Sequence, residues 1–319
     1  VEADWIISND ADIAAVFEVE LPELFTVTAA EYEAIHAAWA KAIKVLPNYT
    51  VVHKQDWFIR EDYRSQTDKE NLSFLSRSYE MHFNERPFLN HKCYLYLTKT
   101  TKERMRMQSS FSSLCRGFII PKEMDKDTTA HFLDTVGQFA RIVNDTGLVH
   151  LRRLVGDEIT GTEDKAGLVE KYFCLSMENT TALEDIELGD DGLRVGDKHV
   201  SVHTLSELDA LPNKVGTDCR YERLSTDKSD CKLSFASPVG LLLSCNHLYN
   251  QYIFLDDSGE NLQRFEKSAR NMQSLSKYSR SNQINKEWID LYLNDAHSFG
   301  LTSVPVSYTH LRAHETKAN

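Results

Sequence analysis

One segment of the chain has the glycine spacing of a phosphate-binding loop. Such a loop needs glycines, so that backbone N–H groups can surround the phosphates, together with a lysine and a serine or threonine that bind phosphate and Mg²⁺. Gly156 and Gly161 fit the glycine positions, but Thr162 stands where the lysine is required. Asp157 and Glu158 would also face the negative charge of a nucleotide. We therefore predict a solvated loop here, without nucleotide binding.

Other reactive residue types lack the partners that their chemistry needs. Nucleophilic catalysis uses a serine in a GxSxG turn, which the sequence does not contain, or a cysteine with a basic partner. Cys115 has only the adjacent Arg116, and one arginine does not define an activated thiol. His199 and His203 lie on a predicted strand, where we expect surface positions, and no HExxH motif is present. We predict no catalytic, cofactor-binding or metal-binding residue in this chain.

The densest basic cluster is the best candidate for contact with a partner. It consists of Lys99, Lys102, Arg104 and Arg106. These residues could contact an acidic protein, nucleic acid or a membrane surface, or they could simply be a solvated helix start. Aromatic residues are not interleaved with the basic ones, so the cluster does not indicate stacking on single-stranded nucleic acid.

Composition and charge exclude several classes of protein. The chain has 319 residues, of which 41% are hydrophobic and 26% are charged, as in an ordinary soluble globular protein of roughly two domains. The net charge of −12 opposes DNA binding by the surface as a whole. The six cysteines form no CxxC pair, which favours unpaired thiols in a reducing cytoplasm. The first residues include neither an initiator methionine nor a signal peptide, so we expect a truncated start.

The first hundred residues predict strands and helices in alternation. The apolar run Cys93–Leu97 indicates a central strand over 92–98 that is buried on both faces. Residues 5–7 and 13–21 should form a hairpin, a capping box at Thr28 should begin a helix that ends before Pro47, and residues 49–59 should be extended. A second capping box should begin another helix, whose inward residues would be Leu72, Leu75, Tyr79 and Phe83.

The rest of the chain predicts a second, smaller region. A helix is expected over 128–145, then short helices over 148–173 with a loop near 156–165. A small meander should follow over 184–202, a loop over 212–232, two strands over 239–256 and a long helix over 260–296. The whole pattern predicts an α+β fold with mixed, largely antiparallel sheets and helices layered on one face. We place two subdomains at 1–180 and 181–304.

Residues 305–319 differ in character from the rest of the chain. They resemble translated sequencing-adapter sequence, and we expect a non-native tail that packs poorly against the core.

Three long segments carry a resemblance to a known family. Residues 17–59, 82–117 and 249–301 closely resemble the N-terminal region of the TraG family of conjugative-transposon ATPases, which are relatives of the large ATPase of type IV secretion channels. The resemblance covers about residues 1–304. It implies an α+β region that docks to inner-membrane components of the channel, at the cytoplasmic side of the bacterial inner membrane.

The same resemblance implies that the chemistry lies outside this chain. In the family, a RecA-like P-loop domain that binds ATP and Mg²⁺ follows the N-terminal region. The chain stops before that domain should appear, so no residue here inherits a catalytic role and we expect no ATP hydrolysis. Self-association is left open. Two alternatives are a stand-alone module that uses Lys99–Arg106 to bind an acidic partner or a membrane, and a DNA-binding module.

Overall fold

The chain folds as an α+β protein, which confirms the fold class predicted from the sequence. The computed structural model describes residues 1–2, 4–8, 11–22, 27–62, 73–84, 86–106, 124–177, 184–190, 192–203, 243, 245–275 and 306–308. In this part of the chain, a large sheet of seven strands is accompanied by a small sheet of three. Neighbouring strands are antiparallel in both sheets.

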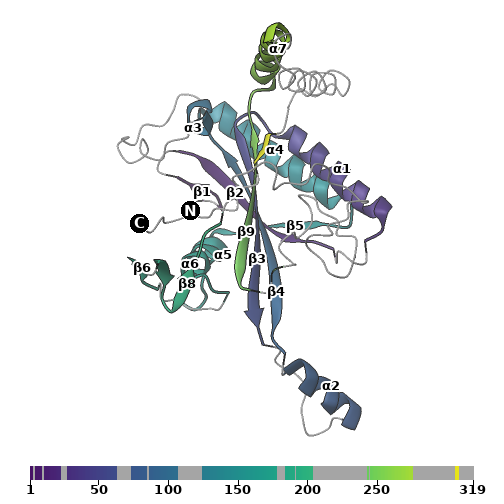
Figure 1. Cartoon of the computed structure of the whole chain (residues 1–319), viewed down its shortest axis with the longest axis vertical. Helices are drawn as coiled ribbons and strands as arrows, with labels where there is room; N and C mark the ends of the chain where they lie inside the picture. Colours follow the sequence, from purple (N-terminus) through teal and green to yellow (C-terminus); the bar gives the residue numbers. More distant parts are fainter. Residues whose placement is uncertain are drawn as a thin grey trace.

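The large sheet has the strand order β1-β2-β4-β3-β9-β10, and β5 also pairs with β2 (Figure 1). Its strands are β1 (Ile6–Ile7), β2 (Ile13–Glu20), β3 (Thr50–Glu61), β4 (Phe88–Lys99), β5 (His150–Arg153), β9 (His247–Leu255) and β10 (Val306–Tyr308). β4 lies between β2 and β3, and its residues Cys93, Leu95 and Leu97 are buried. The predictions of a central strand over 92–98, of the first hairpin and of the extended segment after it are therefore confirmed.

Helices lie on both sides of the large sheet, whereas the sequence predicted helices on one face only. They are α1 (Ala29–Val45), α2 (Phe74–Asn84), α3 (Lys102–Arg106), α4 (Lys126–Asn144), α5 (Gly156–Thr160), α6 (Leu168–Cys174) and α7 (Ser258–Leu275). The long helices α1 and α4 cover one face and enclose the main core with Val52, Leu95 and Ile253 (Figure 1). The short helices α5 and α6 pack on the opposite face, against Trp57 and Tyr94.

Both long helices were predicted from the sequence, and α1 begins at the predicted capping box. Thr28 accepts a hydrogen bond from the backbone N–H of Glu31 at 3.3 Å, and the Glu31 carboxylate accepts one from the Thr28 N–H at 2.9 Å. This reciprocal pair is the capping box expected for α1. The predicted helix over 128–145 is α4, and its inward stripe from Phe132 to Val143 is buried.

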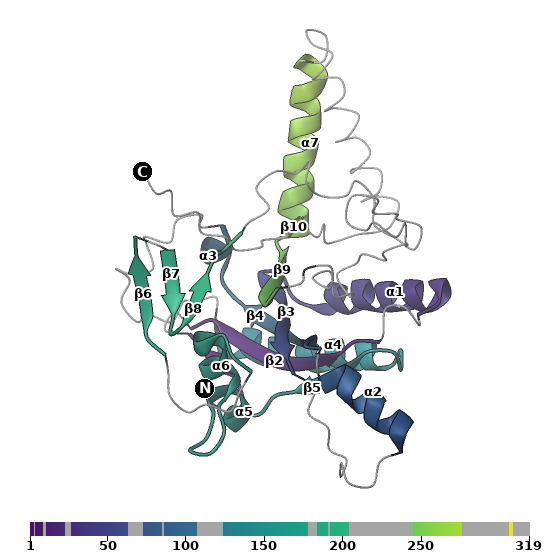
Figure 2. The same ribbon diagram turned by 60° about the horizontal axis from the view of Figure 1, so that its bottom comes forward.

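The small sheet is the predicted meander. It consists of β6 (Ile186–Gly189), β7 (Gly192–Val195) and β8 (Lys198–Val200), which Figure 2 shows beside α6. Lys198 Nζ donates to the carbonyl of Cys174 at 2.8 Å, which links the sheet to α6. The predicted boundary between the subdomains at residues 180 and 181, the loop over 212–232 and the strand before Leu243 lie outside the described residues.

The long helix near the end of the sequence is described over its first part, as α7, and residues 276–296 lie outside the description. In the described part of the chain, no helix combines the length and the apolar character that a bilayer crossing would require.

Two short segments differ from the prediction. Residues 150–153 were expected in a helical region, but they form β5, because Leu151 is buried in the core while the strand pairs with Val19 and its neighbours in β2. Pairing with a distant strand therefore overrides the local helical preference. Gly156–Thr160 forms the helix α5, where a loop was expected.

Part of the expected tail joins the large sheet. Val306–Tyr308 form β10, which pairs with Tyr252–Phe254 of β9. This pairing is at the edge of the sheet, and the expectation that residues 305–319 pack poorly against the core stays a prediction; residues 309–319 lie outside the described part.

Candidate functional site

The basic cluster predicted as a partner contact is engaged within the chain. Lys99 is buried, and its Nζ donates to the carbonyl of Asn48 at 2.7 Å. Arg104 forms an ion pair with Asp12 at 2.7 Å.

Lys102 forms an ion pair with Glu260 of α7, and the side chain of Arg106 lies outside the described residues. Three of the four cationic groups thus connect β4 and α3 to distant parts of the chain, and contact of this cluster with a partner stays a prediction.

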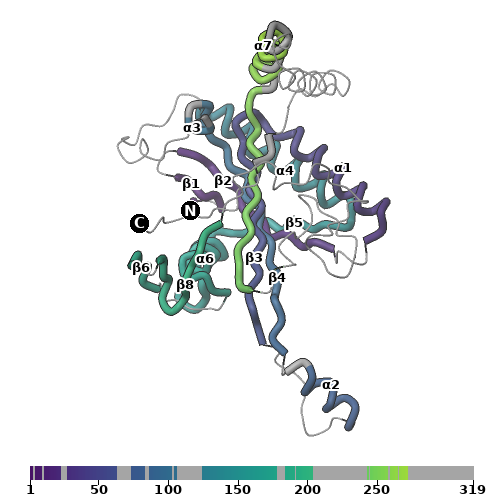
Figure 3. The backbone as a smooth tube through the Cα atoms, in the orientation of Figure 1, coloured from purple at the N-terminus to yellow at the C-terminus, as the bar shows by residue number. Residues whose placement is uncertain are grey.

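α2 lies at the tip of a two-stranded ribbon. β2 pairs with β4 only as far as Cys93, and β9 pairs with β3 only as far as Phe58. The pairing of β3 with β4 continues to Glu61 and Phe88. Figures 1 and 3 show this ribbon running past the rest of the sheet, with α2 beyond its end and away from α1 and α4.

α2 exposes large apolar side chains. Phe74, Leu75, Tyr79 and Met81 are 82%, 78%, 65% and 54% exposed. At about 3.6 residues per turn, these four positions fall on one half of the helix, which we call the apolar half of α2 and which also includes Ser78 and His82; Arg77 falls on the other half. Large apolar side chains that are exposed close together mark interaction sites in folded proteins.

The sequence-based orientation of α2 is therefore wrong. Leu75 and Tyr79 were predicted to face the core, but both are exposed. The ribbon carries the helix beyond the part of the sheet that α1 and α4 cover, so these side chains lie outside the main core. Leu72 and the side chain of Phe83, together with the predicted capping box before them, lie outside the described residues.

A second feature is a hollow of about 420 Å³ on the sheet face opposite α1 and α4. β2, β4 and β5 form its floor, and α5, α6 and the loop between them form its wall. We call it the charged hollow, because its lining includes Glu18, Lys92, Arg152, Glu158, Lys165 and Lys171.

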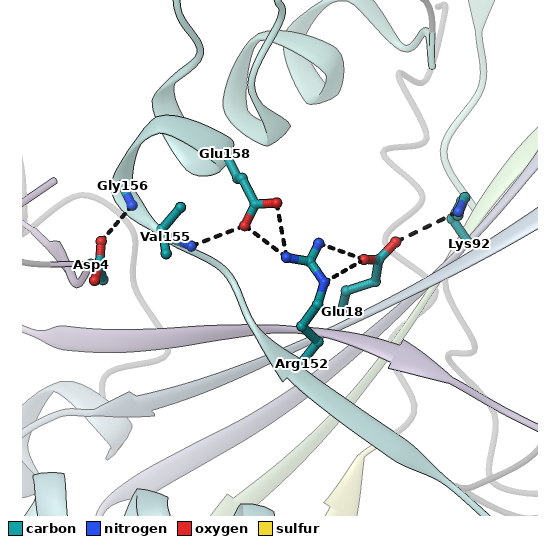
Figure 4. Close-up of polar contacts among 7 residues, drawn as sticks. All are labelled: Asp4, Glu18, Lys92, Arg152, Val155, Gly156 and Glu158. Carbon is teal, nitrogen blue, oxygen red and sulfur yellow. Dashed lines mark hydrogen bonds and ion pairs between the residues drawn. The ribbon is translucent and has the colours of Figure 1, made fainter.

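Arg152 is the centre of a charge network in the charged hollow (Figure 4). Its Nη2 donates to Glu18 at 2.7 Å, and its Nη1 donates to both carboxylate oxygens of Glu158, at 2.8 and 2.9 Å. Lys92 lies 3.6 Å from the other oxygen of Glu18. Burial alone would raise the pKa of Glu18, but the hydrogen bond from Arg152 and the charges of Lys92 and Arg152 outweigh it and lower that pKa.

Lys165 and Lys171 have no such partners. Neither ammonium group has an ion pair or a side-chain hydrogen bond to another described residue. Burial lowers the pKa of Lys171, and the positive charges of Lys165 and Lys92 lower it further. The charged hollow therefore has a corner with unbalanced positive charge.

The loop between α5 and α6 is closed by two glycines. Gly161 has a φ of +93°, and a side chain at Gly167 would overlap backbone atoms of Thr160 and Gly161. Gly161, one of the two glycines that resembled a phosphate-binding loop, thus permits with Gly167 a close approach of two backbone segments. The same closure fixes the loop that carries Lys165.

A third polar cluster is buried under the α1 and α4 side of the sheet. Lys54 and Asp56 are fully buried and form an ion pair of 2.5 Å, and His91 Nε2 lies 2.8 Å from the second oxygen of Asp56. Burial would raise the pKa of Asp56, but the charge of Lys54 outweighs it and lowers the pKa. Burial likewise opposes the charge on Lys54, yet Asp56 raises its pKa.

The buried ion pair of Lys54 and Asp56 has a structural role. Burial raises the pKa of the neighbouring Cys93 well above its usual range, so its thiol stays protonated. The alternation of β3, in which Val52 faces the main core, places Lys54 and Asp56 on the same face. The sequence analysis did not predict this pair, although the alternation in β3 indicates that both side chains share the face of Val52.

The remaining sequence candidates do not come together. His199 Nε2 accepts a hydrogen bond from Arg194 at 3.0 Å, whereas His203 contacts Ser201 at 3.2 Å. Cys115 and Arg116 lie outside the described residues. Among the residues that can be described, no group of three or more histidine, cysteine or acidic side chains is placed to hold a metal ion.

Comparison with known proteins gives one short match. Residues 1–37 match the family described as "Domain of unknown function, B. Theta Gene description (DUF3875)". The matched region contains β1, β2 and the first half of α1. No curated protein matches the chain.

Proposed function

We propose that this chain is the non-catalytic N-terminal region of a TraG-like conjugation ATPase, and that it docks the motor to the DNA-transfer channel. The observation that carries the docking role is the exposed apolar half of α2, at the end of the β3–β4 ribbon. The resemblance of residues 17–59, 82–117 and 249–301 to that family supports the assignment. The reference to B. theta in the description matched by residues 1–37 supports a bacterial source.

The partner that this surface fits is a protein with an apolar groove. A projecting helix with apolar residues on one half is suited to a groove, in which Leu75 and Tyr79 would act as anchors one turn apart. In the proposed assignment, this partner is an inner-membrane protein of the channel, and the chain lies at the cytoplasmic side of the bacterial inner membrane. ATP and Mg²⁺ belong to the downstream motor domain.

The two alternatives have less support. A module that binds acidic proteins or lipid through Lys99–Arg106 would need cationic groups that already pair within the chain at Lys102 and Arg104. A DNA-binding module would have to act against a net charge of −12.

We expect Leu75→Glu and Tyr79→Glu, each introduced into the full-length motor, to lower the frequency of DNA transfer by at least about tenfold. A charge at an apolar anchor costs roughly 2 kcal/mol or more of binding free energy, which exceeds a factor of ten in affinity. The measurement is a mating assay that counts recipients of the mobile element.

The matched control is Arg77→Glu, which adds more negative charge on the opposite half of the same helix. It should leave transfer within about twofold of the wild type, because rim charges contribute little to affinity. Immunoblots must show equal amounts of the three variants. Undiminished transfer in both apolar variants would rule out docking through α2.

A further inference from the structure

We propose that the charged hollow is a binding site for a small organic anion, in which Lys165 and Lys171 hold a phosphate or carboxylate group and the apolar wall contacts the rest of the molecule. The volume of about 420 Å³ suits a small molecule rather than a macromolecule. This inference is independent of the proposed docking function, because it concerns a different face of the chain.

The acidic residues of the charged hollow are mostly engaged. Arg152 binds Glu18 and Glu158 at the same time, and Figure 4 shows its guanidinium between the two carboxylates. Glu61 accepts a hydrogen bond from Asn90 at 3.0 Å. Glu18 and Glu158 thus share the positive charge of Arg152, and Glu61 has a hydrogen-bond donor.

Lys165, Lys171 and Lys92 form a cationic corner of the hollow, and a bound anion would balance its charge. Lys165 and Lys171 have no ion pair to another described residue, and Lys92 reaches only Glu18, at 3.6 Å. The charge of Glu18 favours the charged form of Lys171, but Arg152 already engages that carboxylate. A bound anion would relieve the mutual repulsion of the lysines.

The lining also supplies apolar side chains and one hydrogen-bond donor. Leu154 and Leu168 are buried beside Tyr94, which lines the hollow. Burial, with the nearby charge of Glu18, raises the pKa of Tyr94 to about 12, so its hydroxyl keeps its proton at neutral pH and can donate a hydrogen bond. An aromatic or aliphatic group beside the anionic one would therefore find both contact area and a donor.

The frame around these residues is fixed before any ligand binds. The Gly156 N–H donates to Asp4 at 2.6 Å, and the Val155 N–H donates to Glu158 at 3.1 Å, which anchors the start of α5 (Figure 4). The Gly167 N–H donates to Glu170 at 2.8 Å at the start of α6. A preformed site loses little affinity to ordering on binding.

The test uses calorimetric titration of the chain with phenyl phosphate at neutral pH and low salt. We expect saturable binding, tighter than that of inorganic phosphate, and at least about tenfold weaker binding in Lys165→Met/Lys171→Met because two charged hydrogen-bond donors are lost. The control Lys41→Met/Lys44→Met removes the same charge from exposed positions of α1 and should bind as the wild type does.

Lys165 is exposed in its loop, so the single variant Lys165→Met keeps the fold and should also bind more weakly. Absence of saturable binding, or an equal loss of affinity in the Lys41/Lys44 control, would overturn the proposal. Because the titration needs only the chain itself, its failure would leave the docking function through α2 unaffected.

Discussion

Replacing Asp56 by alanine is expected to lower the free energy of unfolding by about 3–5 kcal/mol, which would be one of the largest effects of a single substitution in this chain. Asp56 and Lys54 are both fully buried, and their ion pair measures 2.5 Å. Without the carboxylate, the ammonium of Lys54 would lose its counter-charge where water cannot replace it. His91 would lose the same hydrogen-bond partner.

Urea denaturation followed by circular dichroism measures this effect. The double variant Lys54→Met/Asp56→Ala should be more stable than Asp56→Ala, because it removes the unpaired buried cation as well. Asp134→Ala on the exposed surface of α4 is the control and should change stability by no more than about 0.5 kcal/mol. A loss at Asp56 no larger than that at Asp134 would show that the pair does not stabilise the fold.

The pH dependence of stability follows from the same pair. The folded-state pKa of Asp56 is below its ordinary value of 3.8, so its contribution is present above that pH and is lost as the pH falls through the folded-state pKa. The folded-state pKa of Lys54 is above 10.5, so its contribution is present below that pH and is lost as the pH rises further. The contribution of the Lys54–Asp56 pair to the free energy of unfolding should therefore be constant across the neutral pH range.

Replacing Phe139 by alanine is expected to cost about 3–5 kcal/mol of unfolding free energy through the cavity that it leaves. Phe139 is fully buried on α4 and meets Trp39 of α1 edge to face, with ring centroids 5.8 Å apart. This contact joins the two helices that cover the main core. Leu133→Ala is the control on the same helix, where a side chain that is 37% exposed should lose less than about 1 kcal/mol. Equal costs at the two positions, measured by urea denaturation, would contradict the packing of α1 on α4.

Elements with strong local signals were predictable from the sequence. The capping box at Thr28 and the apolar stripe from Phe132 to Val143 define α1 and α4, because each depends on residues within one or two turns. β5 was not predictable in the same way. Its four residues have no strand signal of their own and form a strand because β2 pairs with them.

The candidate sites depend on contacts between distant residues, which the sequence does not display. The apolar spacing of α2 predicted a helix correctly, but its exposure results from the length of the β3–β4 ribbon. The charged hollow combines Glu18, Arg152 and Lys171, which lie on three different elements. No pattern in the sequence indicates that they meet. The basic cluster was likewise not predictable, because Lys102 and Arg104 form ion pairs with residues that are distant in the sequence.

α2 is expected to contact a protein of the conjugation channel, and site-specific photo-crosslinking in the assembled machine tests this contact most directly. A photoreactive residue at position 75 of the full-length motor should crosslink to an inner-membrane channel protein, which mass spectrometry would identify. The same residue at position 133, which is also exposed but lies on α4, should give no such product. Crosslinks to the channel from position 133 but none from position 75 would contradict the account.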